Sequence, residues 1–280
     1  MSRPPSPLTT QACSITPVHL RRVQSDPPNG TSLSAALCEG LLDLMGNETT
    51  RLTSLYRTSV HGTNYSDLHD RVFATVFASR RNHLLDGVGD AGPLVVVIKK
   101  DQYVFGAFIS GGIQSPDHTA GGGFYKCDGT AIFHYDMIYD GFRTYECDVW
   151  HFSLAGHFPQ PTKIEGNPER QYVGLLSERW ASMYIGGPGR LYLGPAADIR
   201  NCSQWTDSEY VPDGYTGERI ELDGDAFLGG SYEFTADEIE VLHGSVQQQQ
   251  TEGRTKSVAS RTQVATAVLV GLTAFIYAAS

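Results

Sequence analysis

The sequence predicts an α+β fold that is mostly β, a two-sheet antiparallel sandwich flanked by helices. The chain has 280 residues, of which 30 are glycine and 14 are tyrosine, a composition typical of strands joined by tight turns. Short apolar or alternating runs recur with glycine, proline and aspartate between them, which is the pattern of antiparallel sheets. Helical periodicity is found in two segments, 31–46 and 66–77.

The first helix is expected within residues 31–46. Thr31 or Ser32 can cap its N-terminus, because a side-chain hydroxyl accepts hydrogen bonds from the free backbone N–H groups there. Gly46 provides the C-cap. Four leucines share one helical face: Leu33, Leu37, Leu41 and Leu44.

A corner between a strand and the second helix is expected in the stretch "YRTSVHGTNYSDLHDRV", residues 56–72. The first half alternates like a strand, Gly62 permits the turn, and Ser66 caps a helix that begins at Asp67. The alternative is a catalytic site, because Ser59 and His61 would share one side of a strand. No G-x-S-x-G motif supports that alternative, so we favour the structural corner. The apolar face of the helix is expected to carry Leu68, Val72, Phe73 and Val76.

Residues 93–110 predict two strands separated at Lys100 and Asp101. The run "LVVVI" in the first of them is apolar throughout, which predicts a strand that is covered on both faces. Asp237, Glu238 and Glu240 are expected on the solvated outer face of a single closing strand, a face that could also meet a basic partner. Further strands are expected within 131–139, 148–156, 170–176, 182–187, 190–195 and 232–244.

The composition divides the chain into four parts. Residues 1–30 hold six of the 14 prolines and few apolar side chains, which predicts a disordered tail. Residues 31–244 form the expected ordered domain, and 245–261 read as a polar linker that contains four consecutive glutamines.

The C-terminal segment 262–280 carries no charged side chain. As a helix it would span about 28 Å, close to the roughly 30 Å of a bilayer core. Three basic residues lie just before it, as on the cytoplasmic side of a membrane anchor: Arg254, Lys256 and Arg261. Its richness in alanine, threonine and glycine makes insertion marginal, so a tail anchor and a peripheral apolar tail both remain open.

Charge and cysteine usage exclude several classes of function. A net charge of −10 without a basic stripe argues against nucleic acid as a partner. Five scattered cysteines without a C-x-x-C pair argue against a disulfide framework or a zinc site, and the histidine spacings match no metal site. No cofactor motif is found. The N-terminus lacks the apolar core of a signal peptide, which predicts a cytoplasmic protein.

In their order along the chain, four stretches resemble the TLDc domain of the oxidation-resistance protein family: "SLYRTSVHGTNYSDLH", "GPLVVVIKKDQYVFGAFIS", "MYIGGPGRLYLGPAADI" and "YEFTADEIEV". The residues that fit the family pattern are Leu55, Tyr56, Ser59, His61, Gly62, Phe105, Gly106, Gly186, Gly187, Glu238, Ile239 and Glu240. The family's Gly-Thr-Gly-Glu turn and the strand that follows it can be aligned in two ways. The first places "RTYECDVWHFSL" there, which keeps Thr144 and Glu146. The second places "AIFHYD" on the same strand. The first alignment makes part of 111–141 an insertion, such as an extra hairpin.

The resemblance implies a two-sheet antiparallel sandwich with flanking helices, a role in oxidative-stress protection and, for several members, binding to the vacuolar proton pump (V-ATPase). The leading interpretation is therefore a non-enzymatic protein-interaction module in stress protection that acts on V-ATPase subunits or on a similar membrane-associated complex. One alternative is an enzyme of unknown reaction that uses His61 with Ser59 and Glu146. Another is a tail-anchored adaptor unrelated to the pump.

Overall fold

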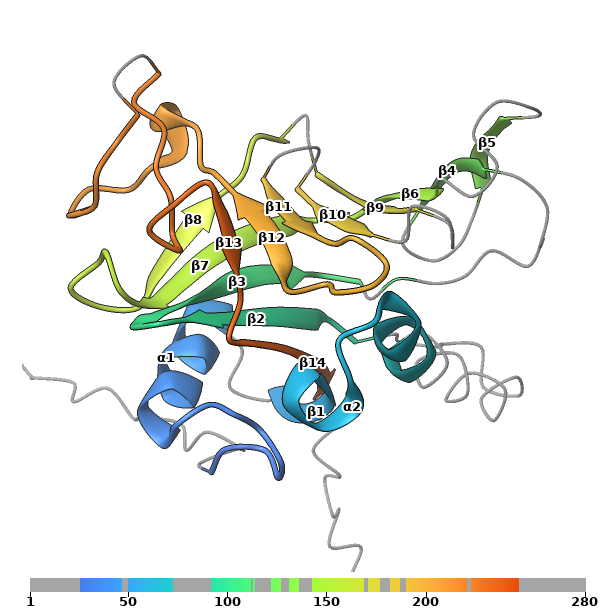
Figure 1. The fold of residues 1–280 in the computed structure, drawn as a ribbon, viewed down its shortest axis with the longest axis horizontal. Helices are drawn as coiled ribbons and strands as arrows, with labels where there is room; N and C mark the ends of the chain where they lie inside the picture. The colour runs from blue at the N-terminus through green and yellow to red at the C-terminus, as the bar shows by residue number, and fades with distance from the viewer. Residues whose placement is uncertain are drawn as a thin grey trace, which may run out of the picture. The chain divides into compact units, whose positions relative to one another are not determined.

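The computed structural model describes the chain at residues 26–46, 50–72, 92–111, 113, 122–126, 131–135, 143–168, 171–176, 182–186, 190–220 and 223–246. Two β-sheets lie face to face and account for most of this structure (Figure 1). The predicted mostly-β sandwich with flanking helices is confirmed.

The first sheet has six strands, and every neighbouring pair in it is antiparallel. In spatial order the strands are β1 (Thr50–Arg57), β14 (Glu238–Val246), β2 (Leu94–Lys100), β3 (Tyr103–Ile109), β7 (Val149–Ala155) and β8 (Thr162–Glu165). The last strand of the domain therefore lies between two early ones, so the sheet closes only when β14 is in place.

The second sheet has eight strands. In spatial order they are β13 (Glu233–Thr235), β12 (Asn201–Gln204), β11 (Leu191–Leu193), β10 (Met183–Ile185), β9 (Tyr172–Leu175), β6 (Arg143–Glu146), β4 (Gly122–Lys126) and β5 (Ala131–Tyr135). Six of its neighbouring pairs are antiparallel, and β4 and β6 pair in parallel. The antiparallel hairpin β4–β5 agrees with the expected extra hairpin.

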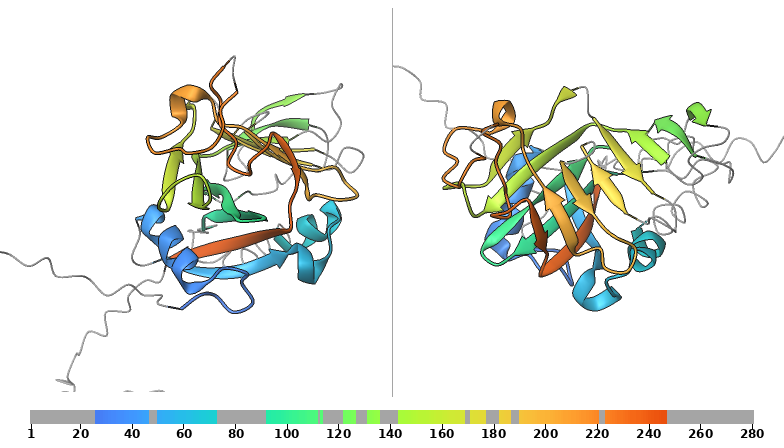
Figure 2. Two further views of the ribbon diagram at one scale, coloured as in Figure 1. Left: turned by 60° about the vertical axis from the view of Figure 1, so that its left-hand side comes forward. Right: turned by 45° about the horizontal axis from the view of Figure 1, so that its top comes forward.

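Strand β2 shows why the two sheets and α1 pack as they do. Val96 and Ile98 belong to the core cluster between the sheets, whereas Val95 and Val97 belong to a second cluster that includes α1 (Ala35–Met45). The prediction that this strand is covered on both faces is confirmed. Figure 2 shows α1 on the outer side of the six-stranded sheet, with the eight-stranded sheet on its other side.

Helix α1 begins later than the sequence predicted. Ser34 is its N-cap, and the Ser34 hydroxyl accepts a hydrogen bond from the Leu37 backbone N–H at 3.3 Å. The expected caps are used elsewhere, because Thr31 accepts from Leu33 N–H and Ser32 bonds to the carboxylate of Glu240. Gly46 ends the helix in the left-handed conformation, at φ 64°, as predicted.

The strand-to-helix corner at residues 56–72 contains one more helical turn than expected. The segment "TSVH" is not the end of a strand but a single helical turn, α2 (Thr58–His61). The following helix begins at 65 rather than 67, so the prediction of Ser66 as its cap is wrong. The Asn64 carbonyl accepts the first backbone hydrogen bonds, from the N–H groups of Asp67 and Leu68. Leu68 and Val72 are buried as expected, and 73–91 lie outside the described residues.

The predicted closing strand is in fact two strands in different sheets. β13 pairs with β12, and after Ala236 and Asp237 the chain crosses to the other sheet as β14. The stretch 143–155 crosses in the same way, since β6 and β7 also belong to different sheets. A continuous β-like sequence cannot reveal such a crossing, because both halves keep strand propensity.

The ordered chain extends slightly beyond the predicted domain bounds. Residues 26–30 are described, and the Gly30 carbonyl accepts a hydrogen bond from Arg57 Nη1 at 2.9 Å. The predictions for 1–25, for most of the linker 245–261 and for the segment 262–280 lie outside the described residues. No helix in the described part of the chain is both long enough and apolar enough to cross a bilayer.

Candidate functional site

His61 lies at the end of α2 and is held by its own neighbours. Its Nδ1 accepts a hydrogen bond from the Arg57 backbone N–H at 2.9 Å, and its ring stacks on Tyr56 with centroids 5.7 Å apart. Burial lowers the pKa of His61, as do the positive charges of Arg71 and Arg57. A neutral ring whose Nδ1 is already an acceptor carries its proton on Nε2. That arrangement positions α2 and leaves Nδ1 unavailable as a base.

Tyr56 and Gly62 complete this corner. The fully buried Tyr56 donates its hydroxyl hydrogen to the Gly62 carbonyl at 2.6 Å. Gly62 has φ 102°, and a Cβ there would overlap the Asp67 carboxylate. The motif is therefore a strand-to-helix corner that requires glycine.

Ser59 binds Glu238, which comes from the distant strand β14. The Ser59 N–H and hydroxyl both donate to the Glu238 carboxylate, at 2.9 and 2.5 Å. Thr58 adds a hydrogen bond at 2.8 Å and Arg57 an ion pair at 2.9 Å. Burial acts to raise the pKa of Glu238, but the hydrogen bonds from Ser59, Thr58 and Arg57 outweigh it and hold this pKa below its usual value.

Glu240 accepts a second set of hydrogen bonds from distant segments, and we call the sets at Glu238 and Glu240 the glutamate clamps. It is fully buried and accepts hydrogen bonds from the Ser32 N–H and hydroxyl, at 2.8 and 2.6 Å, and from the Ser54 hydroxyl at 2.7 Å. The Lys99 ammonium donates to the Ser32 carbonyl beside it. Burial lowers the pKa of Lys99, which the negative charge of Glu240 partly offsets.

The expectation of a solvated acidic face on the closing strand is therefore wrong for two of its three residues. Glu238 and Glu240 are buried and bond groups of the same domain, so they are not available at the surface. Asp237 is exposed, but its carboxylate accepts from the Asp101 N–H at 2.6 Å and closes the tight turn between β2 and β3. The structural reason is that β14 lies between two strands, where its side chains meet the N-terminal segment and α2.

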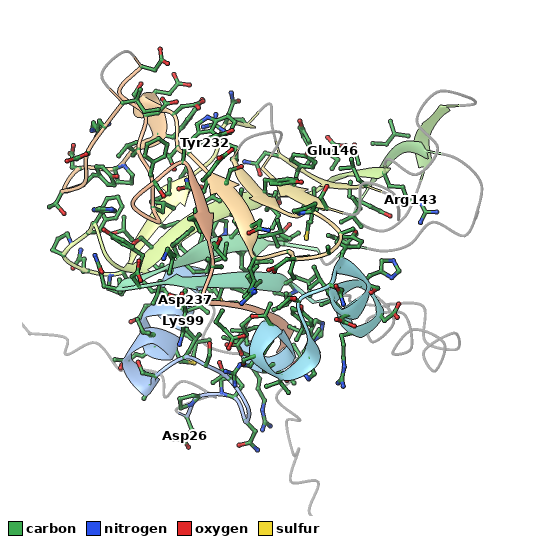
Figure 3. All side chains as sticks on the ribbon, viewed as in Figure 1. Asp26, Lys99, Arg143, Glu146, Tyr232 and Asp237 are labelled. Carbon is green, nitrogen blue, oxygen red and sulfur yellow. The ribbon has the colours of Figure 1, made fainter. Side chains whose placement is uncertain are left out.

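Glu146 is not brought to His61. It ends β6 in the eight-stranded sheet, whereas His61 contacts the region of β1 and β14 in the six-stranded sheet. In Figure 3 Glu146 lies in the upper layer, apart from Lys99 and Asp237 in the lower one. The described residues therefore give no support to a Ser59, His61 and Glu146 catalytic group.

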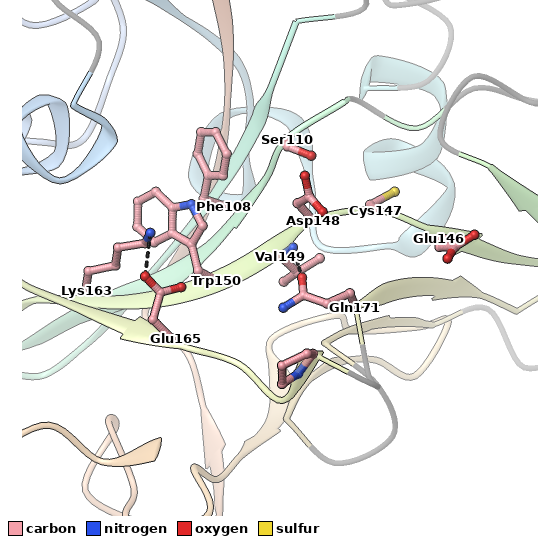
Figure 4. A pocket seen from close by; sticks show the side chains of 11 residues that line it. Phe108, Ser110, Glu146, Cys147, Asp148, Val149, Trp150, Lys163, Glu165 and Gln171 are labelled. Atoms are coloured by element: carbon pink, nitrogen blue, oxygen red, sulfur yellow. Dashed lines mark hydrogen bonds and ion pairs between the residues drawn. The ribbon is translucent and has the colours of Figure 1, made fainter. Parts of the chain in front are cut away.

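Glu146 instead lines an open groove of about 990 Å³ (Figure 4). The groove lies where the chain crosses between the sheets, from β6 to β7 and from β8 to β9. Its lining residues come from β3, β6, β7, β8 and the connections between them: Phe108, Ser110, Glu146, Cys147, Asp148, Val149, Trp150, Lys163, Glu165, Pro168 and Gln171.

Gln171 holds the β6–β7 connection against the β8–β9 connection. Its side-chain oxygen accepts a hydrogen bond from the Val149 N–H, and its carbonyl accepts one from the Cys147 N–H at 3.0 Å. Cys147 is disulfide-bonded, contrary to the expectation from cysteine spacing, whereas the buried Cys38 and Cys202 form no disulfide. The groove wall is therefore preformed by hydrogen bonds that join the two connections.

The glycine and phenylalanine residues that fit the family pattern have packing roles. A Cβ on Gly106 would overlap the Val96 carbonyl oxygen and come within 2.9 Å of the Phe152 ring, so only glycine fits. Phe105 is fully buried between the sheets. Gly186 has φ 80° and lies against the ring of His151, whereas Gly187 lies outside the described residues.

His151 is the buried polar group whose role the sequence did not reveal. It lies on β7 and hydrogen-bonds the Ile185 backbone of the facing sheet. Burial, together with the nearby positive charge of Arg190, lowers the pKa of His151 to about 4. Arg190 is itself buried and paired with Asp207. Among the described residues no cluster of histidine, cysteine, aspartate and glutamate has the arrangement of a metal site.

Comparison with known proteins identifies the domain. A family model described as the TLDc domain matches residues 31–243, nearly the whole of the two-sheet structure. A search of curated proteins gave no match. The matched region includes the His61 corner, both glutamate clamps and the groove. The chain therefore belongs to the TLDc domain family.

Proposed function

We propose that this protein is a non-enzymatic protein-interaction module that acts in oxidative-stress protection through the V-ATPase. Membership of the TLDc family is consistent with a protein-interaction module related to oxidative stress. The observation that carries the proposal is the groove of about 990 Å³, where exposed charged side chains lie beside the half-buried ring of Phe108 on a preformed wall. Surfaces of this kind, on a rigid scaffold, suit recognition of another protein.

The non-enzymatic part is supported by what the candidate catalytic groups do. The Ser59 hydroxyl donates to a carboxylate and not to a histidine, and His61 Nδ1 accepts from backbone. A nucleophile and its base need to be within hydrogen-bond reach, with the base oriented by a third group. The Ser59 interaction holds α2 against β14, and the His61 interaction holds α2 against the end of β1.

A replacement at His61 tests this part. His61→Gln keeps an acceptor for the Arg57 N–H and removes any acid–base chemistry. Cells that depend on this protein for survival in peroxide should therefore be protected equally by the variant and the wild type. Complete loss of protection by a variant that is folded and present at normal abundance would favour the enzyme.

The pump as partner is tested by affinity purification of the full chain from cells under oxidative stress. V-ATPase subunits should be enriched, and deletion of the protein should change organelle acidification, measured with a pH-sensitive dye. Normal acidification together with the absence of pump subunits from the purified material would remove the pump from the proposal.

We also propose a cytoplasmic protein, without nucleic-acid partner or cofactor, whose segment 262–280 anchors it to an organelle membrane. Carbonate extraction of membranes should leave the full chain in the pellet and release a chain that ends at 261. Release of both would mean that the segment is a peripheral tail. Retention of both would place membrane contact elsewhere in the chain.

A further inference from the structure

The mouth of the groove carries negative charge that the domain does not neutralise. Three carboxylates line it, against one ammonium, that of Lys163, which pairs with Glu165 at 2.6 Å. The other two, Glu146 and Asp148, are exposed, and we call them the rim carboxylates. Among the described residues neither carboxylate has an ion-pair or hydrogen-bond partner. They are therefore free to pair with a cation from another molecule.

A small aromatic surface adjoins the rim carboxylates, formed by the half-buried Phe108 and the largely buried Trp150. The rings of Phe108 and Trp150 stack with centroids 4.7 Å apart and planes 17° apart. The Lys163 ammonium lies 5.0 Å from the Trp150 ring centroid, so this surface already receives one cation of its own chain. Aromatic faces also attract guanidinium groups, which stack on them more readily than ammonium groups do.

The groove also runs beside the end of a sheet. β8 is the last strand of the six-stranded sheet, and among the described strands only β7 pairs with it. Lys163 and Glu165 on β8 line the groove, so this strand forms one side of it (Figure 4). The unpaired backbone groups of an edge strand can accept an added strand from an extended peptide.

We propose that this groove binds an extended basic segment of a partner protein. The segment adds a strand beside β8 and brings arginine or lysine side chains to the rim carboxylates and the Phe108–Trp150 surface. Charge complementarity selects this ligand, because the net charge of −10 attracts basic chains and repels acidic ones. The inference rests on the proposed function as an interaction module and assigns it a surface and a partner chemistry.

The test uses three fluorescein-labelled decapeptides and the full-length protein, with binding measured by fluorescence anisotropy. The first alternates arginine and valine, the second replaces arginine by glutamate, and the third is the first with alternate backbone nitrogens methylated. The first should bind and weaken as salt is raised. The second should not bind, and the third should bind at least about tenfold more weakly, since methylation removes the strand hydrogen bonds.

A matched pair of variants locates the site. Glu146→Gln combined with Asp148→Asn should weaken binding of the first peptide at least about fivefold, because two ion pairs are lost. Asp213→Asn combined with Glu218→Gln makes the same change in charge at exposed residues elsewhere and should leave the affinity unchanged. Both variants should show wild-type circular dichroism, since none of the four carboxylates has a partner among the described residues.

Three results would overturn the inference: no binding of the first peptide at about 1 mM protein, equal weakening by both double variants, or equal binding of the methylated peptide. None of these would by itself contradict the proposed function. If the full chain still captures pump subunits while the peptide fails to bind, the interaction module stands and uses another surface. If capture fails while the peptide binds, the groove is confirmed as a site for basic peptides and the pump is rejected as the partner.

Discussion

Glu238 shows how one residue can connect distant parts of this chain. It accepts four hydrogen bonds from three consecutive residues at the start of α2, about 180 positions earlier. Glu238→Gln should lower the free energy of unfolding by about 2–4 kcal/mol, because Arg57 loses its ionic partner and an amide cannot accept all four bonds. Urea unfolding measures the change.

Glu233→Gln is the control for this replacement. Glu233 lies on β13, the strand that precedes β14 along the chain. It is exposed, and its side chain has no partner among the described residues. The same chemical change there should alter the free energy of unfolding by less than about 0.5 kcal/mol. Equal effects of the two replacements would mean that the clamp contributes little to stability.

His151 should make the domain sensitive to mild acid. The pKa of His151 is about 4 in the folded protein and about 6.5 when unfolded, so the unfolded chain binds more protons between these values. Stability due to His151 is therefore complete above pH 6.5 and falls with pH to about 4. The loss approaches about 3 kcal/mol, because each pKa difference of one unit corresponds to 1.36 kcal/mol.

Thermal unfolding between pH 4 and 7 measures this sensitivity. His151→Gln should flatten the decrease in midpoint over that range, since glutamine does not titrate. His69→Gln, at an exposed helical position, should keep the wild-type slope. A wild-type slope in His151→Gln would assign the acid sensitivity to other groups.

At the scale of single elements, β3 is constrained by the strands on both of its sides. Gly106 faces the Val96 carbonyl of β2 and the Phe152 ring of β7, so an added methyl group must displace backbone or an aromatic core residue. Gly106→Ala should cost about 3 kcal/mol of unfolding free energy, the upper end for overpacking. Gly166→Ala, where a Cβ would have no neighbour nearer than 3.5 Å, should be close to neutral.

The helical elements show the limits of local sequence signals. The Gly46 cap was predicted, because a left-handed residue after an apolar helical run is a local property. The N-cap was not, because Thr31, Ser32 and Ser34 have similar capping chemistry. Only the folded chain decides among them, by bonding Ser32 to Glu240.

At the scale of the whole molecule, the fold depends on its last strand. β14 pairs with both β1 and β2 and carries both buried glutamates. A chain that ends at 237 should therefore lack a cooperative unfolding transition, whereas one that ends at 247 should keep it. Near-ultraviolet circular dichroism during heating distinguishes the two. A cooperative transition in the shorter chain would mean that the sheets form without β14.

The candidate site was predicted only in part. The corner at Tyr56, His61 and Gly62 was recognised because its residues are adjacent in sequence. The groove was not, because Glu146 and Asp148 come from one sheet crossing, Lys163 from an edge strand and Phe108 from β3. A site whose residues are far apart in the sequence cannot be recognised from the sequence, and the exposed residues of the groove follow no periodic pattern.

The sequence by itself determined the class of fold, because strand periodicity, turn residues and the apolar run of β2 are local and require burial. It also determined the strand-to-helix corner, since the left-handed conformation of Gly62 is a property of one residue. The tertiary structure decided which acidic residues face solvent. Glu238 and Glu240 alternate like surface residues, yet β14 is inserted between β1 and β2, where donors from β1, α2 and the N-terminal segment satisfy their charges. Glu146 and Asp148, where the chain changes sheets, are exposed.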